Sequence, residues 1–108
     1  MILIVNKRLF SGRFKGISLW PFVILENDEL KKDAVFVNHE KIHLKQQLEM
    51  LVLFFYIWYA IEFFIRYLDC RDSMLAYRNI SFEREAYRRE LDLAYLKKRP
   101  FWAFLKFI

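Results

Sequence analysis

Hydrophobic and polar positions divide the first thirty residues into short runs that predict β-strands. Residues 2–5 are apolar and mostly β-branched, and residues 17–25 form a second, longer apolar run. Between them, residues 11–13 and 15–16 contain both glycines of the chain and are typical of turns. Because Pro21 cannot donate a hydrogen bond to a ladder, the second strand is expected at a sheet edge or at a bulge. The N-terminal part is therefore predicted to be a small β-ribbon or meander.

A long helix is predicted to follow this ribbon. Asp33 is the expected N-cap, and from Ala34 to about Leu68 the chain contains neither Gly nor Pro. Residues that favour helix fill the first half of this stretch. A continuous helix of this length would measure about 50 Å, whereas a domain of this size has a radius of gyration of about 13 Å. We therefore expect the helix to break, to project from the body or to cross a non-aqueous layer.

The second half of this stretch contains an uninterrupted apolar run at residues 51–61, which Glu62 ends. A helix that is apolar on all sides is buried or lies in a membrane. The run is shorter than the roughly 18–20 residues that a membrane span needs. Three interpretations follow: a buried core helix, a membrane-inserted or interfacial helix, and an oligomer contact. Trp58, Tyr59 and Tyr67 are residue types that suit a membrane interface.

Shorter helices are predicted in the last third of the chain. Asp72 is expected to cap a short turn over residues 74–77. A helix is predicted over residues 82–99, and Pro100 ends it. Residues 101–107 form an aromatic tail of one or two helical turns.

Composition narrows the class of protein. A chain of 108 residues allows one domain, and 56% hydrophobic with 19% aromatic residues excludes disorder as the main state. The single cysteine, Cys70, excludes an intramolecular disulfide and a Cys-rich zinc ribbon. The net charge of +5 favours an anionic partner such as lipid headgroups or nucleic acid. No signal peptide is expected, because the apolar start at residues 1–5 is too short; a cytoplasmic or membrane-associated protein is predicted.

The chemistry of the chain centres on its two histidines. His39 and His43 enclose Glu40 in the pattern H-E-x-x-H on the predicted helix. Residues four apart share one helix face, so both imidazoles can bind one metal ion. Glu40 then lies beside the ion, where it can accept a proton from a metal-bound water. The alternative is a solvated helix face that carries two surface histidines.

A catalytic zinc ion needs a third protein ligand. With no third histidine, and with Cys70 in a connector, a carboxylate is expected. Glu83 and Glu85 are both candidates on the next predicted helix, and Glu83 is preferred because it shares a face with Tyr87 and Glu90. The alternative is a salt-bridged helix surface, since this segment mixes charges of both signs.

Residues 39–43 and 83–87 together resemble the motifs of the gluzincin zinc metallopeptidases, especially their minimal members and the relatives of CAAX-type zinc peptidases. In that family H-E-x-x-H lies on an active-site helix and a glutamate on a later helix is the third ligand. The resemblance covers about residues 34–90. It implies a Zn²⁺ ion bound by His39, His43 and Glu83, with Glu40 as the base that later protonates the leaving amine.

The resemblance also implies roles for neighbouring residues. Tyr87 stands where the family has an aspartate that orients the first histidine, and its hydroxyl is expected to accept a hydrogen bond from His39 instead. Residues 16–22 fit the family's edge strand, on which an extended substrate pairs, and they fit a plain core strand equally well. Tyr77, Arg78 and Tyr87 are candidate donors to the oxyanion.

The expected protein is a single α+β domain over residues 1–108 that is mostly helical. A short N-terminal β-ribbon packs on a long active-site helix, and a second helix bears the glutamate. The expected function is a zinc metallopeptidase, a hydrolase that acts on a peptide or protein substrate.

The alternative function is a membrane-associated interaction protein with a structural or inactive zinc site. Residues 51–65 and the basic residues 97–99 beside the aromatic tail support it. The same tail also fits an amphipathic helix that closes the core. Nucleic acid is not an expected partner, because acidic residues lie among the arginines and no binding module accompanies them. The oligomeric state stays open.

Overall fold

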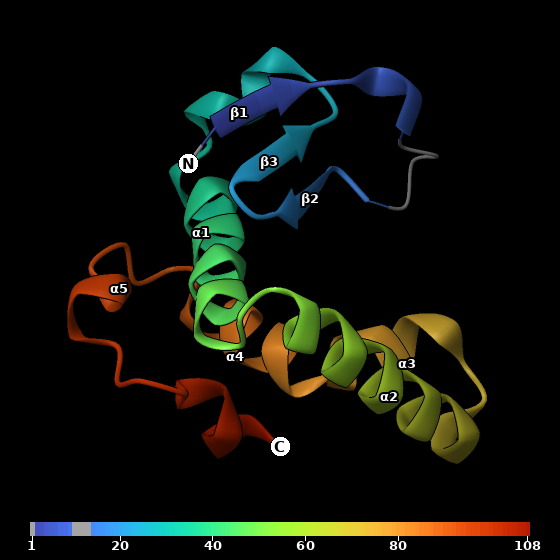
Figure 1. Cartoon of the computed structure of the whole chain (residues 1–108). Coiled ribbons are helices and arrows are strands. Elements are labelled where there is room, and N and C mark those ends of the chain that lie inside the picture. Colours follow the sequence, from blue (N-terminus) through green and yellow to red (C-terminus); the bar gives the residue numbers. More distant parts are fainter. Residues whose placement is uncertain (1, 10–13) are drawn as a thin grey trace.

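A three-stranded sheet forms the N-terminal part of the computed structural model, which describes residues 2–9 and 14–108 (Figure 1). β1 (Ile2–Val5) runs parallel to β3 (Phe22–Leu25), and β2 (Gly16–Leu19) runs antiparallel to β3 on its other side. The order β1-β3-β2 leaves β2 at an edge. The predicted ribbon is thus confirmed, whereas the turn expected at residues 11–13 lies outside the described residues.

The apolar run 17–25 is a hairpin, not the single strand that the sequence predicted. Leu19 pairs with Phe22, so Trp20 and Pro21 form the connection between β2 and β3. Proline fits this turn because it has no N–H to give to a ladder, and for the same reason it would interrupt a continuous strand.

The long stretch without Gly or Pro folds into two helices. α1 (Ala34–Glu49) begins at Asp33, whose side chain accepts a backbone hydrogen bond of 3.1 Å, so the predicted N-cap is confirmed. α2 (Leu53–Cys70) leaves α1 at an angle of 111°. The break lies at Leu51 and Val52, whose φ angles of 55° and 60° are left-handed. A β-branched residue rarely adopts this conformation, so the local sequence does not signal the bend.

α2 is not a buried core helix. Among the described residues of α2, Phe55 alone is buried, and the other side chains are half-buried or exposed. Within the described chain, no helix on its own has the length and apolar character to cross a membrane. α1 and α2 meet that test only as a pair, and the pair is sharply bent.

The later helices are shorter than α1 and α2. They are α3 (Ser73–Asn79), α4 (Ser81–Arg89) and α5 (Tyr95–Lys98), and the 3-10 helices of the described chain are η1 (Lys7–Leu9), η2 (Asp28–Lys32) and η3 (Ala103–Phe107). The side chain of Asp72 accepts hydrogen bonds from two backbone amides at the start of α3, which confirms the predicted cap. η3 confirms the predicted short helical tail.

α4 ends at Arg89, ten positions before the predicted end at Arg99. The reason is a contact with α1: the Asn38 side chain donates hydrogen bonds to the carbonyls of Glu90 (2.9 Å) and Asp92 (3.0 Å). Those carbonyl oxygens would be acceptors inside a longer helix. A tertiary contact therefore overrides the helical propensity of the sequence.

α1 connects the two parts of the molecule, because it contacts β2 at one side and α2 and α4 at the other (Figure 1). The main core cluster surrounds Phe82 of α4, which is fully buried against Phe55 and Phe104. A smaller cluster joins β3 to α1 through Val23, Leu25 and Leu44. The observed fold is α+β and mostly helical, as the sequence predicted.

Candidate metal centre

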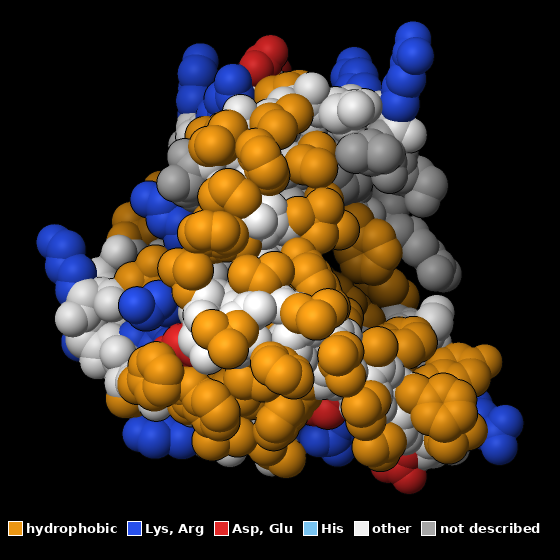
Figure 2. All heavy atoms as spheres, in the orientation of Figure 1, with side chains coloured by type: hydrophobic (Ala, Val, Ile, Leu, Met, Phe, Trp, Pro, Cys, Tyr) orange, Lys and Arg blue, Asp and Glu red, His pale blue; other side chains and the backbone are white. Residues whose placement is uncertain are grey.

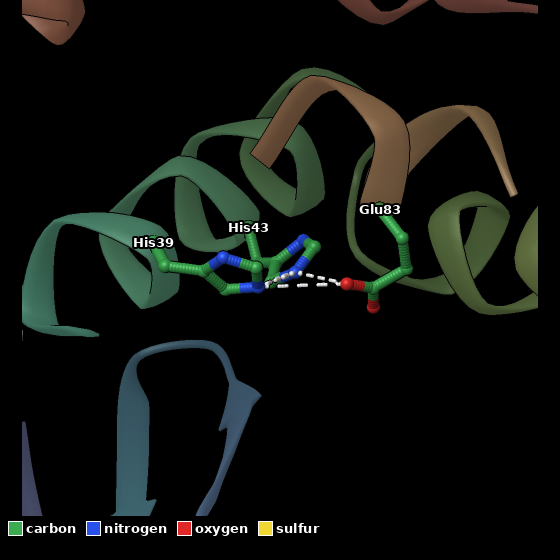
Figure 3. A group of neighbouring side chains, drawn as sticks. All are labelled: His39, His43 and Glu83. Atoms are coloured by element: carbon green, nitrogen blue, oxygen red, sulfur yellow. Dashed lines mark hydrogen bonds and ion pairs between the residues drawn. The ribbon is translucent and has the colours of Figure 1, made fainter. Parts of the chain in front are cut away.

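His39, His43 and Glu83 converge between α1 and α4 (Figure 3). Nε2 of His43 lies 3.2 Å from Nε2 of His39 and 3.0 Å from Oε1 of Glu83. Nε2 of His39 lies 3.5 Å from the same carboxylate oxygen. Two ligand atoms of a tetrahedral zinc ion with ordinary bond lengths are about 3.3 Å apart. The three atoms therefore form a triangle of the size that one zinc ion requires.

The helices place these side chains for simple reasons. His39 and His43 are one turn apart on α1 and project from the same face. Glu83 lies in the first turn of α4. Glu62 of α2 holds the start of that helix, because its carboxylate accepts hydrogen bonds from the backbone N–H (2.7 Å) and the hydroxyl of Ser81. A carboxylate at a helix N-terminus is also favoured by the helix dipole.

Gln46 fixes the orientation of His43. The Gln46 amide nitrogen donates to the carbonyl of Phe82 (3.1 Å) and to the Glu85 carboxylate (2.9 Å), so its Oε1 must be the acceptor on the other side. That oxygen lies 2.8 Å from Nδ1 of His43. Nδ1 therefore carries a proton, and in the neutral ring the lone pair lies on Nε2, which faces His39 and Glu83.

Glu90 does the same for His39. Its Oε2 lies 2.8 Å from Nδ1 of His39, and an ionised carboxylate only accepts, so Nδ1 is the donor. The sequence assigned this role to Tyr87, and that assignment is wrong. The Tyr87 ring packs edge-on against His39 with the centroids 4.5 Å apart, and its hydroxyl pairs with Tyr77 at 3.2 Å. Tyr87 thus packs against the imidazole of His39, and the carboxylate of Glu90 orients that imidazole.

The site consequently brings three acceptor atoms together in a buried place, with His39, His43 and Glu83 each 4–6% exposed. Such a group needs a cation. Burial lowers the pKa of His43, but the Glu83 carboxylate outweighs burial and raises that pKa to about 9. Burial likewise opposes ionisation of Glu83, yet the two histidines hold its pKa well below the usual range. Without a metal, a proton on His43 supplies the missing positive charge.

Glu83 and not Glu85 joins the histidines. Its second oxygen, Oε2, accepts a hydrogen bond of 2.8 Å from the hydroxyl of Tyr59, which leaves Oε1 directed at the imidazoles. Glu85 points to the opposite side of α4, where Arg99 and the Tyr95 hydroxyl bind its carboxylate. Of the two glutamates that the sequence left open, Glu83 is the one that lies beside both histidines.

Glu40 is buried on α1 next to the sheet. Its Oε2 accepts a 2.5 Å hydrogen bond from the hydroxyl of Ser18 on β2. No described residue hydrogen-bonds its other oxygen, Oε1. The carboxylate is thus held by one oxygen and retains acceptor capacity at the other, which a general base requires.

The edge of β2 is partly occupied. The Gln47 side chain donates to the carbonyl of Ser18 and accepts from the N–H of Trp20, both at 2.7 Å. β2 is the edge strand that the sequence predicted, but an extended peptide that paired at these two groups would have to displace Gln47. Gly16 lies close beneath Phe36 of α1, and an added Cβ would come within 2.5 Å of that ring.

A group of hydroxyls lies beside Glu83. Burial and the Glu83 carboxylate raise the pKa of Tyr59 and of Tyr77, so both hydroxyls stay protonated and can donate. The Arg78 guanidinium stacks on the Tyr87 ring at 3.8 Å from its centroid. All three candidate oxyanion donors named from the sequence, Tyr77, Arg78 and Tyr87, therefore form one cluster near Glu83.

The three side chains could together hold one metal ion. They offer two imidazole nitrogens and one carboxylate oxygen, and these atoms all lie within 4.8 Å of one another.

Several functional residues escaped the sequence interpretation. Gln46 and Glu90 carried a usable signal, because they follow His43 and Glu83 by three and seven positions on the same helix faces. Ser18, Tyr59 and Glu62 carried none, because each reaches the site from another element.

Compared with protein-family models, with curated proteins and with solved structures, the chain matches none of them.

Proposed function

We propose that the protein is a zinc-dependent peptidase, with His39, His43 and Glu83 as metal ligands and Glu40 as general base. One observation carries the proposal: both histidines have Nδ1 engaged by an acceptor, so that both Nε2 atoms face the same Glu83 oxygen. A histidine that binds a metal generally donates its other ring N–H in this way. The resemblance of these motifs to gluzincins supports a peptide as the substrate.

The number of ligands favours catalysis over a structural role. Structural zinc sites are closed by four protein ligands, whereas catalytic sites use three and keep one position open. The described residues bring together three. The proposed site is therefore an open one.

Zinc would supply Lewis acidity, which polarises the substrate carbonyl and lowers the pKa of water to near 7. Glu40 would take the proton of the attacking water as the new C–O bond forms. It would then deliver that proton to the nitrogen of the departing amine as the C–N bond breaks. The hydrogen bond from Ser18 holds the carboxylate for both transfers.

The tyrosine hydroxyls would stabilise the negative charge that develops on the carbonyl oxygen of the substrate as water attacks. Tyr77 and Tyr87 share a hydrogen bond of 3.2 Å, so one hydroxyl proton is available beyond the pair. Replacing one such donor costs about a hundredfold or more in turnover where it acts on the transition state. Tyr77→Phe and Tyr87→Phe, each assayed at saturating substrate, identify which hydroxyl does so.

The first experiment is metal content by elemental mass spectrometry on untagged protein purified without chelators. We expect one zinc per chain, and its loss in His39→Ala. Protein that stays free of zinc even after zinc is added back contradicts the proposal at its first step.

The second experiment separates binding from chemistry. Glu40→Gln should retain the zinc and lose hydrolysis of a quenched-fluorescence peptide library. Glu29→Gln, at an exposed position on η2, is the matched control and should behave as wild type. Full zinc with no peptide cleaved by the wild type would leave a metal site without the proposed activity.

A further inference from the structure

α2 carries an ion pair on its inward side and an apolar stripe on its outward side. On the inward side Phe55, Tyr59, Glu62 and Arg66 follow one another at helical spacing, and the charged pair Glu62–Arg66 lies there. On the outward side of α2, the residues at the same helical spacing are all apolar. A helix at a water-exposed surface normally carries its charged residues outside and its apolar residues inside.

The outward stripe of α2 is highly exposed. It consists of Leu53, Ile57, Ile61, Phe64 and Leu68, which are 65%, 47%, 55%, 61% and 50% exposed. Phe54 and Ile65 extend it on one side, each 56% exposed. Figure 2 shows hydrophobic side chains gathered over α2 and the C-terminal segment, in the lower half of the view.

The C-terminal segment continues this surface. Phe101, Leu105 and Ile108 are 73%, 44% and 59% exposed. Between α2 and this segment lies a mostly apolar groove of about 740 Å³. Phe54 and Ile57 line it on one side and Trp102 and Ile108 on the other, and Glu49 and Glu62 also contribute to the lining. We call α2's outward side together with this segment the apolar face. Apolar patches of this extent mark a binding surface.

We propose that the apolar face docks on a lipid bilayer, with α2 lying in the interface. With 3.6 residues per turn, the outward stripe together with Phe54 and Ile65 spans about 120° of the helix circumference. A helix that lies in a bilayer interface buries an apolar face of this kind among the acyl chains.

The borders of the face also fit a bilayer. Tyr56 and Tyr67 flank the outward stripe on one side, and Trp58 flanks it on the other. Tyrosine and tryptophan are the residues that concentrate where acyl chains meet headgroups. Lys97 and Lys106, near and within the C-terminal segment, are exposed. These two cations would meet anionic headgroups at about 1 kcal/mol each.

Docking in this manner leaves the metal centre clear. Tyr59 and Glu62, on the inward side of α2, hold Glu83 and the start of α4. The proposal does not depend on the peptidase activity.

The test is flotation of the full chain with phosphatidylcholine vesicles, with and without phosphatidylglycerol. We expect binding to both, tighter with the anionic lipid, and persistence in high salt because apolar contacts are not screened. Ile57→Asn combined with Ile61→Asn should weaken binding by about a hundredfold. Leu91→Asn combined with Leu93→Asn, at sites 79% and 58% exposed outside the face, is the matched control and should bind as wild type.

Two further measurements keep the outcome decisive. In Trp20→Phe protein, Trp58 and Trp102 are the remaining tryptophans, and lipids brominated in their acyl chains should quench their fluorescence. This measurement leaves the apolar face unaltered. Zinc content should be full in the Ile57/Ile61 variant, which shows that its fold and metal site are intact. Wild-type protein that does not float, or that forms a dimer in solution which this variant dissociates, overturns the proposal.

Discussion

Nδ1 of His39 lies 2.8 Å from the carboxylate of Glu90, at the point where α4 ends. Glu83 lies in α4 and Glu90 is the residue that directly follows that helix, so one short segment supplies both the third candidate ligand and the group that orients the first. Any shift of α4 against α1 would therefore move two parts of the site together.

Replacing Glu90 by Ala should weaken zinc binding by about 10- to 100-fold, because the His39 ring loses the acceptor that fixes its Nδ1–H. Glu90→Gln should cost less, since an amide oxygen can still accept. Competition titration with a chromogenic chelator measures both affinities.

Tyr87→Phe is the contrasting variant. In the wild type the Tyr87 hydroxyl contacts Tyr77 and not His39, so removing that hydroxyl should change zinc affinity by less than about twofold. A large loss in Tyr87→Phe together with a small loss in Glu90→Ala would return the orienting role to the tyrosine.

The sequence predicted the parts of the site that depend on local spacing. His39 and His43 share a face of α1 by helical periodicity, and Asp33 and Asp72 begin helices because of their short polar side chains. Glu83 was preferred to Glu85 on the same kind of argument. These properties are set by residues within one or two helical turns of one another.

What the sequence did not predict depends on distant contacts. α4 ends early because Asn38 captures carbonyls more than fifty positions away. The bend after α1 requires left-handed φ angles at Leu51 and Val52, residue types that disfavour them. Tyr59 reaches Glu83 only because that bend folds α2 back beside α4.

Glu83 and Glu85 should separate metal binding from stability. Arg99 has a fully buried side chain held by Glu49 and Glu85. Glu85→Gln should therefore lower the free energy of unfolding by about 3 kcal/mol, because a buried cation loses one partner. Glu83→Gln should remove zinc instead and leave the metal-free fold in place.

Denaturant unfolding and zinc stoichiometry on both variants check this pair. The zinc-loaded fraction of folded Glu85→Gln should match that of wild type. Loss of zinc from folded Glu85→Gln, with zinc retained in Glu83→Gln, would make Glu85 the ligand.

Asn38→Ala should destabilise the protein by about 1–3 kcal/mol, because partly buried carbonyl oxygens lose their donor. The same change frees the end of α4 that carries Glu90, so zinc affinity should fall as well. Asn38→Asp should be as damaging, since a carboxylate cannot donate. A stability loss with unchanged zinc affinity would mean that Glu90 keeps its place without the Asn38 contacts.

Stability of the metal-free protein should fall as pH rises from about 6.5 to about 9. Burial lowers the pKa of His43, but Glu83 outweighs it and raises that pKa to about 9 in the folded chain, against 6.5 for the ordinary side chain. The folded state therefore binds the proton more tightly than the unfolded state. The resulting stabilisation, about 3 kcal/mol, is complete below pH 6.5 and is lost as pH passes through 9.

Zinc should show the opposite trend. It needs the neutral His43 ring, so below pH 9 each zinc that binds displaces a proton and affinity rises with pH. The increase in melting temperature on adding zinc should thus grow between pH 6.5 and 9, because a ligand stabilises in proportion to its affinity for the folded state. Differential scanning fluorimetry with zinc and with chelator across this range measures it. In His43→Gln both trends should vanish, and a zinc-dependent shift that is equal at all pH values in the wild type would contradict the displaced proton.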